Sequence, residues 1–351
     1  MQELRQNPAT REWVIIATER RKRPDEFRRR NSPSSPPEQV DTCPFCPGNE
    51  GMTPPEEQAY RTEGTHPNTP DWWVRVVANR FAALHPEGNL QRTRQESFFL
   101  KMKGVGKHEV IIETPRHNEV MAFMEEKQLE EIILTYRDRY LALSRDPRFK
   151  LIIIFKNHGE RAGTSLEHPH SQIVATPIVP LYIRNRLEEA MRYYDDYGTC
   201  VYCDMLQEEL NAGDRIVIET SQYVVFNPFA SQVPFETWII PRVHSASFAN
   251  IGIEEAKGLG RVLKAILSRL YHKLHDPDFN LVIHTAPIGD EDGEYYHWYL
   301  QILPRLTTPA GFEIGTGIYI NHALPEETAL FLRDTASPRE AIGTVSDEIA
   351  R

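Results

Sequence analysis

The chain has 351 residues, with 50 acidic and 40 basic side chains and a formal net charge of −10. This length exceeds one typical domain and predicts two core units or one duplicated fold. The acidic balance argues against broad nucleic-acid binding, no apolar run is long enough to cross a membrane, and the N-terminus lacks the apolar core of a signal peptide, so we expect a cytoplasmic protein with neither nucleic-acid nor membrane partners.

The first local feature along the chain is a basic stretch. Residues 20–30 contain seven basic and two acidic side chains, starting at Arg20 and including Arg23. Such a stretch is typical of a solvated arm, but it also fits a local phosphate-binding site. The composition leaves both interpretations open.

The cysteines form two Cys-x-x-Cys pairs, and no cysteine is left over. The first pair is Cys43 and Cys46, and the second is Cys200 and Cys203. In a chain without secretory features, this spacing favours zinc over disulfides. The pairs are too far apart in the sequence to form one local zinc ribbon, so each needs further ligands of its own, and histidines are the expected type.

An internal repeat assigns those histidines. Helical patterns at 125–143 and 254–274 each precede a related segment, 146–151 and 276–281, and the order Cys-x-x-Cys, His, His occurs once in residues 1–178 and once in 179–351. Four ligands close a tetrahedral site, which indicates two structural Cys₂His₂ zinc sites, with iron as an alternative metal and incidental thiols as the competing interpretation. The predicted ligands are Cys43, Cys46, His117 and His168 in the first half, and Cys200, Cys203, His244 and His297 in the second.

The segment His168-Pro169-His170-Ser171-Gln172 carries the strongest chemical signal. It lies between apolar runs at 151–155 and 173–175, and in a strand His168, His170 and Gln172 would share one face. The second half repeats His297 but has Tyr299 where the first half has His170. We therefore assign His168 to the metal, expect His170 to be free, and place the chemistry in the first half.

A free neutral imidazole is a competent nucleophile because its ordinary pKa is near 6.5. Gln172 and Ser165 could donate hydrogen bonds to phosphoryl oxygens, and Asn157 with the turns at Gly159 and Gly163 would allow close backbone approach. Attack of His170 on phosphorus would give a reversible phosphoramidate. That intermediate suits group transfer in two steps.

These motifs together resemble the galactose-1-phosphate uridylyltransferase family of the histidine-triad superfamily. The matching segments run nearly end to end and include 13–16, 20–24, 43–46, 79–84, 115–117, 157–172 and 234–237. The resemblance implies an α+β, duplicated histidine-triad-like fold with two antiparallel sheet units and crossing helices. It also implies a homodimer with active sites near the subunit interface, and a ping-pong mechanism through a nucleotidyl-histidine at His170.

The same resemblance implies roles for the remaining residues. Gln172 and Ser165 would contact the phosphates, Asn79 and Asn157 would hold the nucleotide, and Arg20 and Arg23 would lie near the sugar phosphate. Hydrolases of the superfamily carry a third histidine where this chain has Gln172, which favours transfer over hydrolysis. The candidate substrate-binding residues are Arg20, Arg23, Asn79, Asn157, Gly163, Ser165, Phe312, Gly315 and Gly317.

The glycine-rich segment 311–317 departs from the uridylyltransferase pattern. It lacks a Tyr-Glu pair that contacts the hexose in well-known bacterial members, and with the second Cys-x-x-Cys it is also similar to the ADP-glucose phosphorylase branch. We expect a flexible substrate loop there. The leading hypothesis is transfer of a uridylyl group between UDP-glucose and galactose 1-phosphate. The alternatives are an ADP-glucose phosphorylase-type adenylyltransferase and, from another class, a non-catalytic zinc-stabilised nucleotide-binding protein.

Overall fold

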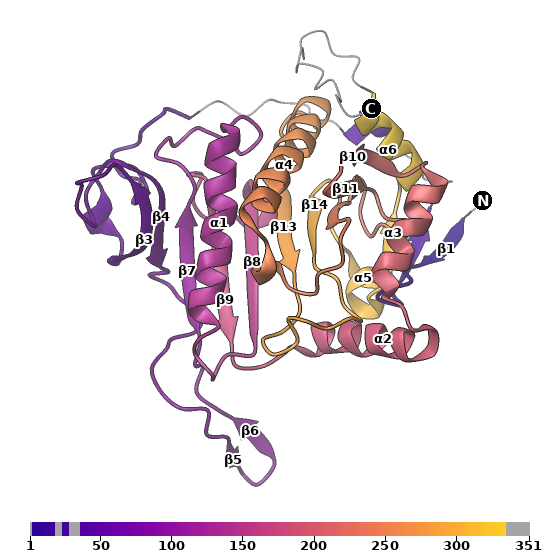
Figure 1. Cartoon of the computed structure of the whole chain (residues 1–351), viewed down its shortest axis with the longest axis horizontal. Coiled ribbons are helices and arrows are strands. Elements are labelled where there is room, and N and C mark those ends of the chain that lie inside the picture. Colours follow the sequence, from indigo (N-terminus) through magenta and orange to yellow (C-terminus); the bar gives the residue numbers. More distant parts are fainter. Residues whose placement is uncertain (1, 18–22, 28–35, 335–351) are drawn as a thin grey trace, which may run out of the picture.

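The structure, a computed structural model, describes residues 2–17, 23–27 and 36–334. Its centre is one ten-stranded antiparallel sheet, to which each half of the chain contributes five strands (Figure 1). From one edge to the other, the strands are β3 (Glu56–Arg61), β4 (Trp72–Ala78), β7 (Lys107–Ile112), β9 (His170–Thr176), β8 (Leu151–His158), β13 (Phe279–His284), β14 (Tyr299–Pro304), β12 (Thr237–Pro241), β11 (Tyr223–Phe226) and β10 (Ile216–Glu219).

The duplication is visible in the strand order. Counted outward from the middle, β8, β9, β7, β4 and β3 of the first half correspond to β13, β14, β12, β11 and β10 of the second. The halves meet where β8 pairs with β13, from Phe279 opposite His158 to Ile283 opposite Ile154. The α+β fold class is confirmed, and the two antiparallel units are joined edge to edge in one sheet.

Two long helices cover one face of the sheet. They are α1 (Glu126–Leu143) and α4 (Ile253–Leu274), and they pack against each other in front of the middle strands (Figure 1). In α1, Leu129, Ile132, Ile133, Tyr136 and Tyr140 are buried, at the three- and four-residue steps that predict an amphipathic helix. Both predicted helices are therefore present, each within one residue of its expected start.

The opposite face is covered differently in the two halves, and this difference positions the site. In the second half, α2 (Leu181–Tyr197) and α3 (Val201–Ala212) bury Trp238 and Tyr299 in a second apolar cluster. In the first half, a smaller cluster around Cys43, Phe45 and Cys46 lies over that face. The first half therefore lacks the two-helix cover, and the face that carries His170 and Gln172 is left accessible near Gln172, which is partly exposed.

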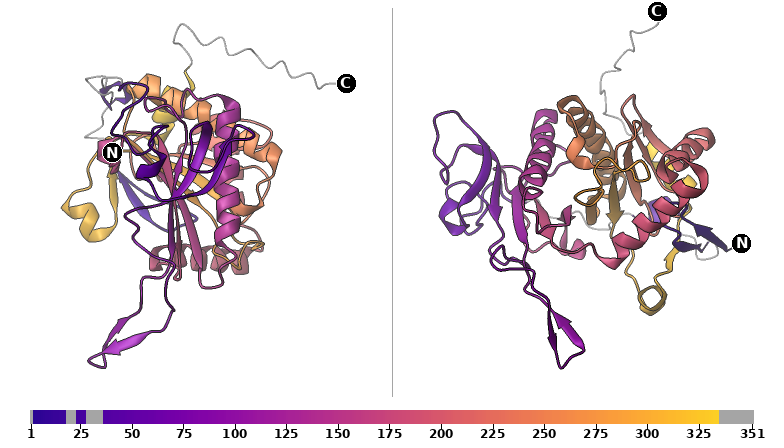
Figure 2. Two further views of the ribbon diagram at one scale, coloured as in Figure 1. Left: turned by 90° about the vertical axis from the view of Figure 1, so that its left-hand side faces the viewer. Right: turned by 60° about the horizontal axis from the view of Figure 1, so that its bottom comes forward.

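Several shorter elements complete the fold. Strand β2 (Trp13–Ile16) pairs with β1 (Glu3–Gln6) on one side and with β15 (Tyr319–Asn321) on the other, beside the second half, where Arg5 forms an ion pair of 2.8 Å with Glu326. The hairpin β5 (Thr93–Gln95) and β6 (Phe99–Lys101) projects away from the body (Figure 2). The remaining elements are α5 (Gly311–Thr316), α6 (Pro325–Arg333), and the 3₁₀ turns η2 (Pro24–Phe27), η3 (Glu50–Met52), η4 (Glu160–Ala162) and η5 (Phe248–Asn250). Across the described residues, no helix combines the length and apolar character needed to cross a membrane.

Candidate active site and metal centres

The first predicted metal site is assembled from three separate segments. Cys43 and Cys46 lie in the loop before η3, His117 follows β7, and His168 lies two residues before the start of β9; all four are buried and their ligand atoms lie within 4.8 Å of one another. His168 Nδ1 is 3.7 Å from the sulfur of Cys43 and 3.6 Å from that of Cys46. A tetrahedral zinc with ordinary bond lengths would set its sulfur and nitrogen ligands about 3.6 Å apart, so these residues fit zinc.

The protonation states of this cluster also suit a cation. The Nε2–H of His168 donates to the Thr114 carbonyl at 2.8 Å, which leaves Nδ1 as the ligand atom. Burial lowers the pKa of His168 to about 4, so the imidazole is neutral near pH 7. Burial raises the pKa of the Cys43 thiol to about 11, and a bound cation would hold it as the thiolate.

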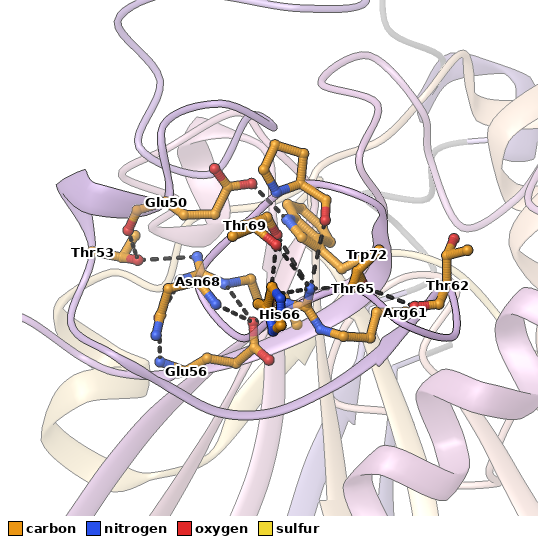
Figure 3. Close-up of polar contacts among 12 residues, drawn as sticks. Glu50, Thr53, Glu56, Arg61, Thr62, Thr65, His66, Asn68, Thr69 and Trp72 are labelled. Atoms are coloured by element: carbon orange, nitrogen blue, oxygen red, sulfur yellow. Dashed lines mark hydrogen bonds and ion pairs between the residues drawn. The ribbon is translucent and has the colours of Figure 1, made fainter.

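The residues that follow the loop with Cys43 and Cys46 make polar contacts that anchor this loop to the sheet, and Figure 3 shows these contacts. Glu50 accepts a hydrogen bond of 2.8 Å from the Trp72 indole on β4. Thr53 accepts one of 3.0 Å from Arg75, and Arg75 is fully buried. This network fixes the loop relative to β3 and β4, and therefore fixes the two thiols.

The second predicted metal site is more exposed and less complete. Cys200, Cys203 and His244 bring their ligand atoms within 4.8 Å of one another. His297 Nδ1 lies 3.4 Å from the sulfur of Cys203, and its Nε2 is buried without a hydrogen-bond partner. Three of the four predicted ligands therefore form a group that could hold a metal, and His297 contacts that group through Cys203.

His170 has the geometry of an oriented nucleophile. It is the first residue of β9, is almost fully buried, and its Nδ1–H donates to the His168 carbonyl at 2.8 Å. The Phe45 ring packs edge-on against it, with 5.3 Å between ring centroids. Because Nδ1 carries the proton, the lone pair is on Nε2. Burial lowers the pKa of His170, which favours the neutral imidazole.

A buried ion pair supports this strand from behind. Lys156 on β8 donates to Glu113 at 2.6 Å and to the His170 carbonyl at 3.2 Å. Glu113 also accepts from Ser171, whose hydroxyl lies 2.6 Å from that of Tyr136. Sequence analysis missed this network. The available signal was Lys156, a cation directly after an apolar strand run, but its partners are distant in the sequence.

Gln172 lies in a second polar group on the same face as His170. Its Oε1 is 2.7 Å from Nε2 of His108 and 3.5 Å from Nδ2 of Asn79. The β7–β9 register pairs Ile112 with His170 and Val110 with Gln172, so alternation along β7 places His108 on their face. Sequence analysis missed His108 because only the pairing of β7 with β9 identifies this neighbour.

The turn after β8 brings Asn157 and Gly163 together. Asn157 Oδ1 accepts a hydrogen bond of 2.8 Å from Asn280, which turns Nδ2 toward the turn. Gly163 has a φ of +88°, in the left-handed region that favours glycine. Ser165 follows as an exposed residue. The β8–β9 pairing ends with Phe155 opposite Gln172, so Asn157 and the turn after it follow the end of β8 that lies beside the start of β9.

The other predicted substrate residues that the structure describes lie elsewhere in this chain. Arg23 is exposed and immediately precedes η2, which packs on α4 and α6. Arg20 is outside the described residues. Phe312 and Gly315 lie in α5, and Gly317 caps it with a φ of 73°; the expected flexible loop is therefore a short helix. Helix α5 contacts β15, which pairs with β2 in the separate three-stranded sheet. In Figure 1, α5 lies on the far side of β13 and β14 from β9, the strand that carries His170.

The chain is similar to known proteins over nearly its whole length. Family models described as the N-terminal and C-terminal domains of galactose-1-phosphate uridyl transferase match residues 1–180 and 186–324. The chain is 36% identical to an Arabidopsis thaliana ADP-glucose phosphorylase, over 95% of this chain and 93% of that protein. It is 31% identical to the Thermotoga maritima galactose-1-phosphate uridylyltransferase, over 95% and 99%.

A solved structure gives the same result. The Arabidopsis thaliana ADP-glucose phosphorylase with bound ADP-glucose superposes with a TM-score of 0.80 and 34% identity, covering 96% of this chain and 100% of that one. The similarity therefore extends over both halves of the sheet and both long helices. The chain belongs to the galactose-1-phosphate uridyl transferase family.

Proposed function

We propose that this protein is a nucleotidyltransferase that moves a nucleoside monophosphate group between a nucleotide sugar and a phosphorylated acceptor through a nucleotidyl-histidine at His170. The observation that carries the proposal is the hydrogen bond of 2.8 Å from His170 Nδ1 to the His168 carbonyl. It assigns the lone pair to Nε2 and fixes the ring. Family membership supports the same assignment.

The two chemical steps balance without an external base. In the first, the Nε2 lone pair attacks the α-phosphorus of the nucleotide sugar; the P–N bond forms while the P–O bond to the sugar 1-phosphate breaks, and the leaving group takes the bonding pair. In the second, a phosphate oxygen of the acceptor attacks the same phosphorus, and the P–N electrons return to Nε2. A neutral imidazole needs no deprotonation for this role.

The surrounding residues would bind and orient the phosphates. Gln172 lies two residues after His170 on the same face, where its amide can donate to a phosphoryl oxygen. Ser165 would contact the phosphates together with Gln172, and Asn79 and Asn157 would hold the nucleotide. Zinc in the two cysteine-histidine clusters would be structural: held by His168 and its partners, it would fix the backbone carbonyl that orients His170.

Two substrate pairs fit this reaction. The first is UDP-glucose with galactose 1-phosphate, the activity in the name of the Thermotoga maritima relative. The second is ADP-glucose with inorganic phosphate, and it is favoured by the 36% identity to an ADP-glucose phosphorylase and by the match to its structure with bound ADP-glucose.

Intact-protein mass spectrometry after incubation with one nucleotide sugar, without acceptor, tests the proposal. We expect the mass increment of a uridylyl or an adenylyl group, and its identity decides between the substrate pairs. His170→Ala should abolish the adduct while metal content and the circular dichroism spectrum stay unchanged. If the wild-type protein forms no adduct with either sugar, the alternative of a non-catalytic zinc-stabilised nucleotide-binding protein is favoured instead.

We also propose that residues 1–178 and 179–351 are the two histidine-triad-like halves and that the protein is a homodimer. Because α5 lies away from His170 in the same chain, a contribution of Phe312 or Gly317 to the sugar site requires α5 from a second copy. The projecting hairpin supports dimerisation, since Phe98, Phe99 and Leu100 are 79%, 60% and 61% exposed.

The charge of the hairpin also supports dimerisation with a second copy of the chain. Residues 92–103 of the hairpin carry four basic side chains and one acidic one, whereas the whole chain has a net charge of −10, so the hairpin is complementary to the body of a second copy. Sedimentation velocity should show a dimer that Phe98→Glu with Phe99→Glu converts to monomer. Leu181→Glu, at another exposed apolar residue, is the control. A wild-type monomer would contradict the proposal.

A further inference from the structure

We propose that His108 is a positioning residue that fixes which end of the Gln172 amide faces the reacting phosphate. This inference rests on the nucleotidyl transfer proposed above. A glutamine amide has a donor end and an acceptor end of nearly equal shape. Only the NH₂ end can stabilise an anionic phosphoryl group, so the orientation of this amide determines whether Gln172 assists the reaction or opposes it.

The tautomer of His108 follows from its two neighbours. Its Nδ1 accepts a hydrogen bond of 3.4 Å from the Ala83 backbone N–H. In a neutral imidazole the other nitrogen then carries the proton, so Nε2–H donates to Gln172 Oε1 at 2.7 Å. His108 is therefore a donor toward Gln172.

Asn79 supplies a second donor to the same oxygen. Its Oδ1 accepts a hydrogen bond of 2.8 Å from the Phe81 backbone N–H, which fixes the amide and directs Nδ2 toward Gln172 Oε1 at 3.5 Å. The 3.1 Å separation of Asn79 Nδ2 and His108 Nε2 is then the approach of two donors that share one acceptor. An inverted Gln172 would place its NH₂ against both donors and present its carbonyl to the phosphate.

The second half gives an internal comparison. There His284 Nε2 lies 2.8 Å from Oε1 of Gln301, and the Gln301 NH₂ donates to the buried Glu236 at 2.7 Å. Both ends of that amide are occupied by protein. For the NH₂ of Gln172, no acceptor is recorded among the described residues, and its Oε1 alone is engaged. Each half thus has a histidine–glutamine contact, made from β7 in the first half and from β13 in the second, but only the first leaves the donor end available for a ligand.

The carboxylate that could occupy this donor end is directed away in the first half. Glu109, which corresponds to Glu236 in the repeat, is fully buried and receives two hydrogen bonds, of 2.8 and 2.7 Å, from Arg139 on α1. It therefore lies on the helix-covered face of β7, while His108 lies on the face of Gln172. Alternation along one strand thus separates the charge from the amide.

Three substitutions of His108 distinguish the polarity of this contact from simple packing. His108→Leu removes the donor, His108→Gln keeps an N–H donor near the position of Nε2, and His108→Glu replaces the donor by an acceptor and favours the inverted Gln172 amide. We expect single-turnover formation of the nucleotidyl-enzyme to slow by about 10–100-fold in His108→Leu and further in His108→Glu. His108→Gln should recover most of the rate, with the order of rates independent of thermal stability.

A double-substitution series provides the control. In a Gln172→Ala background, the three His108 variants should have the same rate, because the amide through which His108 acts is absent. Variants that remain different in that background, or a His108→Glu that is as fast as His108→Gln, would overturn the inference. If His108 had only a structural role, the rate reductions in the His108 variants would instead follow their loss of thermal stability.

Calorimetric binding of UMP and AMP to the same variants provides a readout without turnover. Affinity should fall in the order wild type, His108→Gln, His108→Leu, His108→Glu. If the wild-type protein forms no adduct, the proposed transfer fails, and the binding series still decides the role of His108. If the adduct forms but the order of rates and affinities is absent, the inference on His108 fails and the transfer stands. If no adduct forms and neither nucleotide binds, both are overturned.

Discussion

Replacing Lys156 by methionine removes the cation of the ion pair behind the His170 strand. Glu113, the partner carboxylate, is 0% exposed and lies 2.6 Å from the Lys156 amine. Breaking a buried pair from one side leaves an uncompensated charge, which destabilises a protein by about 3–5 kcal/mol. With the usual unfolding entropy per residue, a chain of this length should lose about 4–7 °C in Tm.

The double variant Lys156→Met with Glu113→Gln separates the buried charge from the lost contacts. It removes both charges and leaves an amide that can still bond Ser171 and Tyr136, so it should regain at least half of the stability lost in the single variant. Equilibrium urea unfolding of metal-loaded protein measures both. A single variant within about 1 kcal/mol of wild type, or a double variant less stable than the single one, would refute this reasoning.

Further predictions concern the metal centres, pH and backbone geometry. Cys43→Ser should lose the metal of its fully buried cluster and lower Tm more than Cys203→Ser in the exposed one; equal losses, measured by elemental analysis and calorimetry, would contradict the difference in burial. Desolvation of its ring, which stacks on Tyr299, lowers the pKa of His284 to about 3, so the unfolded chain binds a proton below about pH 6.5 that the folded chain does not. The unfolding free energy should therefore decrease with falling pH more steeply than in His284→Gln, by up to about 1.4 kcal/mol per pH unit; parallel slopes would show that His284 protonates equally in both states. At Gly159, where φ is 82° and ψ is 161°, an added Cβ would lie 2.2 Å from a carboxylate oxygen. Gly159→Ala should therefore lower the free energy of unfolding more than Gly213→Ala, where φ is 72° and no atom is close to the added Cβ. Similar unfolding midpoints for the two variants would argue against the clash.

The strongly periodic parts of the fold were predictable from the sequence. The patterns at 125–143 and 254–274 correspond to α1 and α4 because their apolar side chains recur at helical spacing and pack on one sheet face. The repeat likewise indicated which histidines accompany Cys43 and Cys46, since the same order of ligand types occurs twice. Their four side chains do form a buried group that could hold a metal.

Other features were not accessible to local patterns. Phe312 and the glycines around it were expected in a flexible loop, yet 311–316 is a short helix whose N-terminal Ala310 N–H is bonded by Glu313 at 3.0 Å. The joining of the two sheet units depends on the pairing of β8 with β13, and the Asn157–Asn280 hydrogen bond across it cannot be read from either strand alone. A strand's sequence gives its buried face, whereas its neighbour is set by how all the strands and helices pack together.

The sequence by itself determined the duplication, the two long helices, the ligand types of the metal clusters and the separation of His168 from His170, because these depend on spacing along one chain. Only the tertiary structure decided that Lys156 lies against Glu113 and that His108 donates to Gln172. The first contact joins β8 to the residue that follows β7, and the second joins β7 to β9, so strand register places both pairs within bonding distance. Spacing therefore indicated the proposed nucleophile, and register identified the groups that contact its strand and the neighbouring amide.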